Sequence, residues 1–377
     1  MKALVAVVAA LALAAGACGG SVKDRIASTG PRPAPKLEPV KPAALREFEA
    51  GLRALRLGGP DAPSTARARF EAAIEIDGSL WEAWHALGVI ALEAGDDEAA
   101  VTAFGKALAT NPSHTPSRLA RAEAYRAAGD DKQARADYEA TLRELAEDDP
   151  LRPDAAARLA SQLRDEGAYD DAIDVLRETL RVTGATSRVY TELGLVYLAQ
   201  ARLDLAALVL SKAAELDGKD PAVANAQALL AIARGDAQQA FDRFDAATSL
   251  DPTYLDARFN KAAVLLDAGD HARAKAELTI VIEKRPTDLD AQVALGVALR
   301  GLGDLTGARA LWDKVIAGAA RRSTARADAL FNVAILQIDF LEDIDGGKAS
   351  LERYLQDAPR KHAKRAAAEE KRKELGL

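Results

Sequence analysis

The chain has 377 residues, of which 50 are Lys or Arg and 57 are Asp or Glu, giving a formal charge of −7 at pH 7. The charges are interspersed and form no basic patch of the kind that nucleic acid requires, which excludes that class of partner. The single cysteine excludes an internal disulfide and every two-cysteine metal or redox motif.

The first predicted element is an apolar segment at the N-terminus. Lys2 is followed by an apolar run of roughly 13 residues, which is too short to span a bilayer but suits the core of a signal peptide. Gly16 and Ala17 then lead to Cys18. The stretch "LALAAGACGG" resembles a bacterial lipoprotein signal, in which the cysteine receives the lipid and becomes the first residue.

This resemblance implies a signal peptide over residues 1–17 and lipidation of Cys18. Ala15 departs from the leucine that is commoner at its position, and an ordinary secretory signal cleaved near the same place is the alternative. Gly19 stands where an aspartate would retain the protein at the inner membrane, which by resemblance to enterobacterial sorting favours the outer membrane. We therefore expect a protein of the bacterial cell envelope that is held by its lipid and faces the periplasm.

Residues 18–42 form the next segment, which begins with the lipidated cysteine. It contains five prolines, few large apolar residues and mixed charges, so it is predicted to be a semi-rigid tether without a core. At about 3 Å per residue, such a tether would hold the following domain some tens of ångströms from the membrane.

A regular spacing of glycines follows the tether. The intervals between them are 34, 38, 68, 34 and 34 residues, and Ala201 stands midway through the longest. The glycines are Gly95, Gly129, Gly167, Gly235, Gly269 and Gly303. A period of 34 residues is typical of stacked helix–turn–helix units.

Residues 81–114 show why the period has this length. Trp84 and Ala91 recur at helical spacing on one predicted buried stripe, and Gly88 lies on it where two helices approach closely. Gly95 suits the left-handed end of the first helix, and Asp96 suits the cap of the second. The same roles return in seven consecutive units.

This pattern resembles the tetratricopeptide-repeat family over residues 43–359. The resemblance implies an all-α, right-handed superhelical solenoid of about nine helix–turn–helix repeats, with irregular first and last units. The first unit carries an insertion, and the last lacks the glycine turn. Residues 360–377 are charged and alanine-rich and are predicted to form a final solvated helix.

Motifs for catalysis or cofactor binding are weak in this sequence. No two of the four histidines have metal-ligand spacing, and "GLGDLTG" and "DIDGGKAS" both depart from phosphate-binding loops. We therefore expect no enzyme activity, no catalytic residue, no metal, no cofactor and no small-molecule substrate. Proteins are the expected partners.

Helix geometry predicts where a protein partner would bind. Positions 2, 5, 9 and 12 of each first helix lie roughly 130° from the stripe that faces the stack. In the family this second stripe lines a concave groove that holds an extended or helical segment of a partner. In the second and third of the regular units it is polar, with Glu123, Arg126, Ser161 and Arg164.

In the later units the same positions are mostly apolar. We predict a partner-binding groove from Leu195, Leu198, Asn225, Leu229, Ile232, Phe259, Leu266, Val293, Val297, Phe331 and Ile335, which Ile338 extends. The alternative is that tight stacking half-buries these residues without any partner. The family's carboxylate clamp for peptide C-termini is not recognisable.

The features together predict a lipid-anchored scaffold within a cell-envelope complex. The last unit, "FNVAILQIDFLED", with the lipoprotein signal, resembles the repeat lipoprotein of the adventurous gliding motility complex of myxobacteria. Outer-membrane assembly factors, pilotin-like lipoproteins and regulators of cell-wall synthesis remain alternatives.

Overall fold

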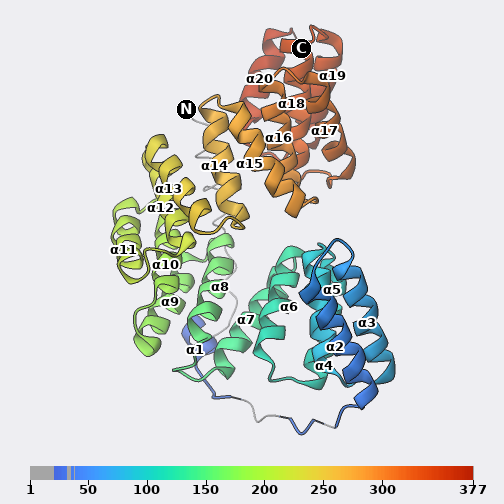
Figure 1. The fold of residues 1–377 in the computed structure, drawn as a ribbon. Helices are drawn as coiled ribbons and strands as arrows, with labels where there is room; N and C mark the ends of the chain where they lie inside the picture. The colour runs from blue at the N-terminus through green and yellow to red at the C-terminus, as the bar shows by residue number, and fades with distance from the viewer. Residues whose placement is uncertain (1–20, 32–34, 38, 377) are drawn as a thin grey trace. The chain divides into compact units, whose positions relative to one another are not determined.

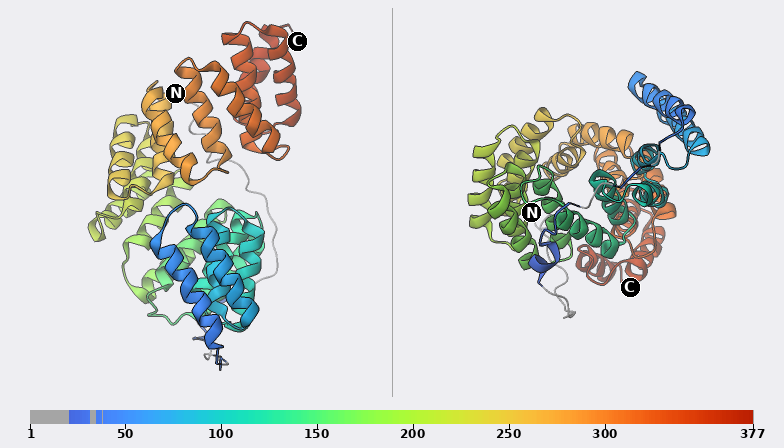
Figure 2. Two further views of the ribbon diagram at one scale, coloured as in Figure 1. Left: turned by 45° about the vertical axis from the view of Figure 1, so that its right-hand side comes forward. Right: turned by 90° about the horizontal axis from the view of Figure 1, so that it is seen from below.

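The computed structural model describes residues 21–31, 35–37 and 39–376. Within these ranges the chain forms α-helices and one short π-helix, and no strand. The chain divides into two compact units, an N-terminal unit whose described part ends at Val196 and a C-terminal unit that begins at Tyr197. Figures 1 and 2 show that consecutive helices pair side by side within each unit.

Successive pairs of antiparallel helices build the N-terminal unit, with one extra short helix before them. The elements are α1 (Val22–Ile26), α2 (Pro42–Leu57), α3 (Ala62–Ile76), α4 (Trp81–Glu93), α5 (Asp97–Thr110), α6 (Thr115–Ala127), α7 (Asp131–Glu144), α8 (Arg152–Asp165), α9 (Tyr169–Thr183) and α10 (Ser187–Ala199), which crosses the boundary. Even-numbered helices from α2 onward are the first helices of the repeats, and odd-numbered ones are the second.

The C-terminal unit continues the same alternation up to its last repeat. Its elements are α11 (Leu203–Leu216), α12 (Pro221–Arg234), α13 (Ala237–Leu250), α14 (Leu255–Asp267), α15 (His271–Lys284), α16 (Leu289–Gly301), α17 (Leu305–Gly318), α18 (Thr324–Ile335), the π-helix η2 (Leu336–Phe340), α19 (Ile344–Asp357) and α20 (Arg365–Glu374). None of the helices in the described part of the chain is long and apolar enough to cross a membrane.

The roles expected for residues 81–114 are present in α4 and α5. Gly95 has a φ of 75° and ends α4, while the Asp96 side chain accepts a hydrogen bond from the backbone N–H of Ala99 and caps α5. The ring of Phe104 occupies the space that a side chain on Gly88 would need. The glycine therefore allows the two helices of the pair to approach closely.

Two turns lack the expected glycine and adopt the left-handed conformation nevertheless. Ala201 has a φ of 56° at the site where the glycine series skips a unit, and Glu342 has a φ of 55° in the last repeat. The turn hydrogen bonds of the stack impose this backbone. In the last repeat, η2 lengthens the end of the first helix before that turn.

The expectation of an extended tether is wrong for residues 21–30. Val22 and Ile26 are one helical turn apart and both buried, in a short helix that is capped by a reciprocal pair of hydrogen bonds between Ser21 and Asp24. α1 packs against α7 and α9. Composition alone did not reveal this helix, because only two apolar residues are enough to bury one turn.

The C-terminal helix lies inside the range predicted for it but is not entirely solvated. α20 packs against α19, and Ala368 is fully buried at the end of a core cluster that includes Trp312 and Tyr354. The sequence shows this residue only as one alanine among several, so its burial depends on the helix that meets it.

Candidate functional site

The candidate groove lies on the first helices of the C-terminal unit. α14 contacts α16, and α16 contacts α18, so these first helices stand side by side. Asn260 donates from Nδ2 to Oδ1 of Asn225 at 3.3 Å, which links α12 to α14. Because the repeat register is constant, equivalent positions on these helices form continuous rows.

The predicted groove residues are less exposed than an open apolar surface would be. Two of them, Asn225 and Val293, are buried, each 7% exposed, and Ile338 is buried as well. The others are half-buried: Leu195, Leu198, Leu229, Ile232, Phe259, Leu266, Val297, Phe331 and Ile335. The predicted row is therefore the rim of the core, with one side against the stack and one side toward solvent.

The packing of individual rim residues supports this description. Leu229 and Ile232 pack against the core cluster around Phe244, and Phe259 packs against the cluster around Leu278. Leu198 belongs to the C-terminal unit. Leu195 lies three residues earlier on the same helix, α10, in the part that belongs to the N-terminal unit.

A row of aspartates borders the apolar row, which the sequence interpretation missed. Asp256 and Asp290 occupy position 2 of α14 and α16, and Asp328 occupies the equivalent repeat position of α18, which begins three residues earlier. Asp256 pairs with Arg285 at 2.6 Å, and Asp328 pairs with Lys364 at 2.7 Å. The repetition of an acidic residue at one register position was visible in the sequence and is the signal that could have found this row.

Asp290 is the unpaired member of the row. It is exposed, and in the part of the chain that the structure describes no cation pairs with it. Partial removal of water by its surroundings raises the pKa of its carboxyl, and the nearby carboxylates of Asp288 and Asp328 raise this pKa further. A basic group placed here would relieve that repulsion.

Arg300 interrupts the apolar row at position 12 of α16. Its guanidinium lies 5.7 Å from the centre of the Trp312 ring and 5.4 Å from that of Phe340. Burial lowers the pKa of Arg300, and Asp339 opposes this effect. The side chain thus adds a cation to the rim, held by aromatic faces.

The equivalent positions of α6 and α8 in the N-terminal unit carry an ion-pair network instead. Arg158 bonds to Glu123 at 2.6 Å, and Arg126 bonds to Asp165 at 3.0 Å. Arg164 donates to the hydroxyl of Ser161 and pairs with a carboxylate on α10. These polar groups satisfy one another across the repeats, so this face presents no apolar row.

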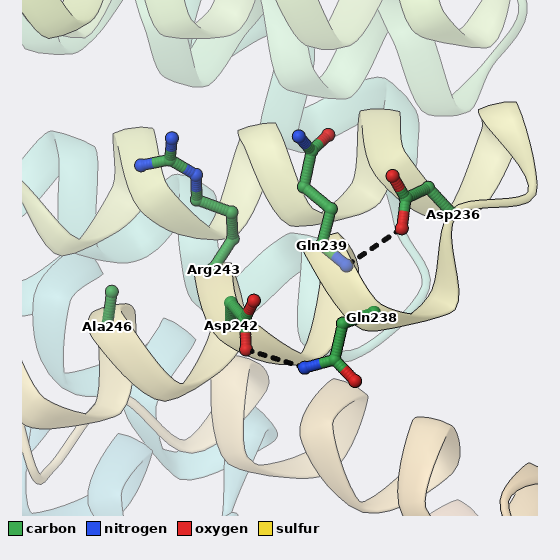
Figure 3. A pocket seen from close by; sticks show the side chains of 6 residues that line it. All are labelled: Asp236, Gln238, Gln239, Asp242, Arg243 and Ala246. Carbon is green, nitrogen blue, oxygen red and sulfur yellow. Dashed lines mark hydrogen bonds between the residues drawn. The ribbon is translucent and has the colours of Figure 1, made fainter.

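Neither a deep cavity nor a metal cluster marks another site within the described ranges. The hollow in Figure 3 lies on α13 alone, and its lining side chains are largely polar and partly bonded to each other, as with Gln238 and Asp242. No group of three or more His, Cys, Asp or Glu side chains in the described residues could hold a metal ion.

Known proteins match the chain in its repeats. Family models described as tetratricopeptide repeat match residues 81–114, 158–221, 231–283 and 259–327. A curated relative, TPR repeat-containing protein PA0015 of Pseudomonas aeruginosa, is 34% identical over 82 residues, which cover 22% of this chain and 78% of the relative. Anaphase-promoting complex subunit 3 of Schizosaccharomyces pombe is 29% identical over 128 residues, 34% of this chain, and the match spans only 19% of that relative's length.

Two solved structures are similar at low sequence identity. Pseudomonas aeruginosa pilF is 19% identical with a TM-score of 0.48, over 59% of this chain and 97% of the other. The Cut9-Hcn1 hetero-tetramer of the APC/C is 16% identical with a TM-score of 0.48, over 82% of this chain and 55% of the other. Together with the repeated helix pairs, the sequence matches show that the chain belongs to the tetratricopeptide-repeat family, whose members are generally scaffolds for protein–protein interaction.

Proposed function

We propose that the protein is a lipid-anchored scaffold of the bacterial cell envelope whose C-terminal unit binds a partner segment along α12, α14, α16 and α18. The partner segment is apolar, extended or helical, and carries a basic side chain beside its apolar face. The observation that carries this proposal is the unpaired Asp290 next to a half-buried apolar row, where the corresponding faces of α6 and α8 are closed by ion pairs.

The apolar row and the row of aspartates together indicate which chemical groups a partner segment should carry. Half-buried side chains such as Phe259 and Val297 still have apolar surface to lose to a partner, and burial contributes about 25 cal/mol per Å². Asp290 lacks a counter-ion and would gain one from a lysine or arginine of the partner. A cationic apolar segment therefore complements both rows at once.

The lipid anchor rests on the N-terminal sequence, because Cys18 lies outside the described residues. Acyl chains contribute about 0.8 kcal/mol per buried CH₂, and two or more chains anchor a protein stably. The anchor would place the scaffold in the envelope, at the outer membrane facing the periplasm. The gliding motility complex, outer-membrane assembly factors, pilotin-like systems and cell-wall synthesis regulators are the machines it could serve there.

Changing Cys18→Ser tests the anchor. The variant should lose labelling by a fatty-acid probe and should no longer fractionate with membranes, because serine cannot form the thioether that carries the lipid. Labelling and fractionation equal to those of the unmodified chain would contradict the lipoprotein interpretation.

Site-specific photo-cross-linking from intact envelopes tests the groove. A photoreactive residue at Val297 should capture a partner peptide that is apolar and contains Lys or Arg, and Asp290→Asn should reduce this capture. The matched control carries the photoreactive residue at Ala276, an exposed position on the second helix α15. Equal capture from both positions, or capture indifferent to Asp290→Asn, would contradict the groove. The identity of the captured protein decides among the machines.

A further inference from the structure

The segment that precedes the repeats is docked on the N-terminal unit. α1 packs against the second helices α7 and α9, whereas the candidate groove is built from first helices of the other unit. Val22 and Ile26 are each 1% exposed and share one side of α1. A helix of five residues has no stability of its own in water, so it depends on the face that covers it.

Charge complementarity fixes how α1 lies on this face. Arg25 donates from Nε to Oε1 of Glu139 at 2.9 Å, and its Nη2 lies 3.6 Å from a carboxylate oxygen of Asp171. Lys23 lies 3.3 Å from Asp174. Glu139 is buried, so Arg25 supplies the cation that this carboxylate needs.

The residues after α1 extend the contact to the end of α7. The backbone N–H of Thr29 donates to the carbonyl of Arg143 at 2.8 Å, and the hydroxyl of Ser28 donates to the carbonyl of Leu145 at 2.8 Å. The last carbonyls of a helix have no partner within the helix. The segment therefore gives a partner to the Arg143 carbonyl and adds a second donor to the Leu145 carbonyl, which also accepts from Arg152.

We propose that the face of α7 and α9 is a peptide-docking site distinct from the groove, and that its occupant is residues 21–29 of the same chain. The site selects two apolar side chains one helical turn apart, an arginine between them, and a hydroxyl residue after the helix. Because of this docking, residues 21–29 are fixed to α7 and α9 instead of forming an extended tether. One consequence rests on the proposed lipidation: Cys18 precedes Ser21 by three residues, at most about 11 Å of chain, so this face would lie next to the bilayer.

Hydrogen exchange on the full chain in detergent tests the docking. Amides of residues 21–30 should exchange at least about tenfold more slowly than in a synthetic peptide of residues 21–31. Val22→Asp combined with Ile26→Asp should abolish this protection and speed exchange at the end of α7. Leu37→Asp is the matched control, because Leu37 lies in the same linking segment but is 47% exposed, and it should leave the protection unchanged.

Three outcomes would overturn the proposal. The segment could exchange at the rate of the free peptide, the double variant could retain the protection, or the protection could vanish on dilution as a dimer dissociates, which would make a second copy the occupant. The repeats should keep their helical circular-dichroism signal in the double variant, because only the five residues of α1 undock. Arg25→Glu, which keeps both apolar side chains, should lose part of the protection and provides a second variant.

Energy transfer separates this proposal from the proposed anchor. Glu147→Cys places a fluorophore at an exposed site two residues from Leu145, with acceptors on lipid headgroups of reconstituted vesicles. Energy transfer to the lipid acceptors should fall in the Val22→Asp, Ile26→Asp double variant. A failed anchor abolishes transfer in every chain while exchange protection persists, whereas failed docking leaves transfer equal in both chains and protection absent.

Discussion

At the scale of single residues, backbone conformation and protonation are imposed by the stack. Ala201 occupies the left-handed region although it has a Cβ, and the turn bonds from its N–H to Leu198 and from the Arg202 N–H to Tyr197 are both 2.9 Å long. The same turn in the next repeat uses Gly235 at a φ of 79°. The alanine thus bears a strain that its neighbours avoid.

Ala201→Gly should therefore stabilise the protein. Relief of the left-handed strain, about 1–2 kcal/mol, outweighs the extra entropy of a glycine in the unfolded chain, so a net gain of about 0.5–1 kcal/mol is expected. Urea unfolding followed by circular dichroism measures this gain. Gly235→Ala should shift the midpoint in the opposite direction, and equal signs for the two variants would refute the assignment of strain.

His114 is a neutral cap whose titration makes stability depend on pH. Its Nδ1 accepts from the backbone N–H of Ser117 at 3.2 Å and shares the Ser117 hydroxyl with His85. Burial and then the charge of His85 lower the pKa of His114 from 6.5 to about 4. The unfolded chain thus takes up a proton first as the pH falls.

The contribution of neutral His114 to the free energy of unfolding is complete above pH 6.5 and is lost progressively toward pH 4. His114→Asn keeps a capping acceptor but does not titrate. We expect the melting temperature of the unmodified chain to fall more steeply over this interval than that of His114→Asn. Parallel curves would show that His114 has the same pKa in the folded and unfolded chains.

At the scale of the helices, each first helix has a stack-facing side and a rim, and their tolerance to substitution should differ. Gly296 touches Trp312 so closely that any side chain would overlap the indole. Ala262 is fully buried at the equivalent position of α14. Phe259 and Leu229, by contrast, keep one side toward solvent.

Gly296→Leu and Ala262→Leu should lower the unfolding free energy by about 1–3 kcal/mol through overpacking. Phe259→Glu and Leu229→Glu should cost less, about 1 kcal/mol, since each side chain is only partly buried and a carboxylate there can reach water. The same glutamates should abolish partner capture, because a bound apolar segment would leave the carboxylate desolvated. Glutamates that melt the protein as strongly as the leucines would show that the row is core.

At the scale of the whole molecule, the first and last repeats differ in whether a helix outside the repeats covers their core. α20 covers the core beyond α19, with Ala368 buried and Lys371 paired to Asp339 at 2.9 Å. No described residue covers the first repeat in this way, and α2 keeps Leu45 and Leu52 exposed. Terminal cover matters in stacked repeats because each repeat is supported only by its neighbours.

Ala368→Glu should detach α20, because a carboxylate cannot enter the core cluster without a partner. Faster hydrogen exchange over residues 365–374 and a lower melting temperature are the expected readouts. Ala367→Glu, one residue earlier on the exposed side, should change neither. If both variants behave alike, α20 is not a cap.

The repeat pattern was predictable from the sequence because it is enforced locally and then repeated. Gly88, Gly95 and Asp96 each serve a conformation within one helix pair, and their recurrence predicted the family, the helix pairs and the turn sites. Most boundaries of the regular units follow from the same period. The sequence also assigned the predicted groove residues to one face of the first helices, because register alone determines the face of a helix on which a residue lies.

What the sequence could not decide depends on which neighbours meet a given side chain. Period and residue type do not distinguish a buried Val293 from a half-buried Val297, because the difference lies in how far the adjacent helix covers each one. The same holds for Ala368, and for Val22 and Ile26, whose burial requires helices more than a hundred residues away in the chain. Local pattern therefore determined the repeats, whereas burial, ion pairing and the docking of both terminal segments were decided only by tertiary contacts.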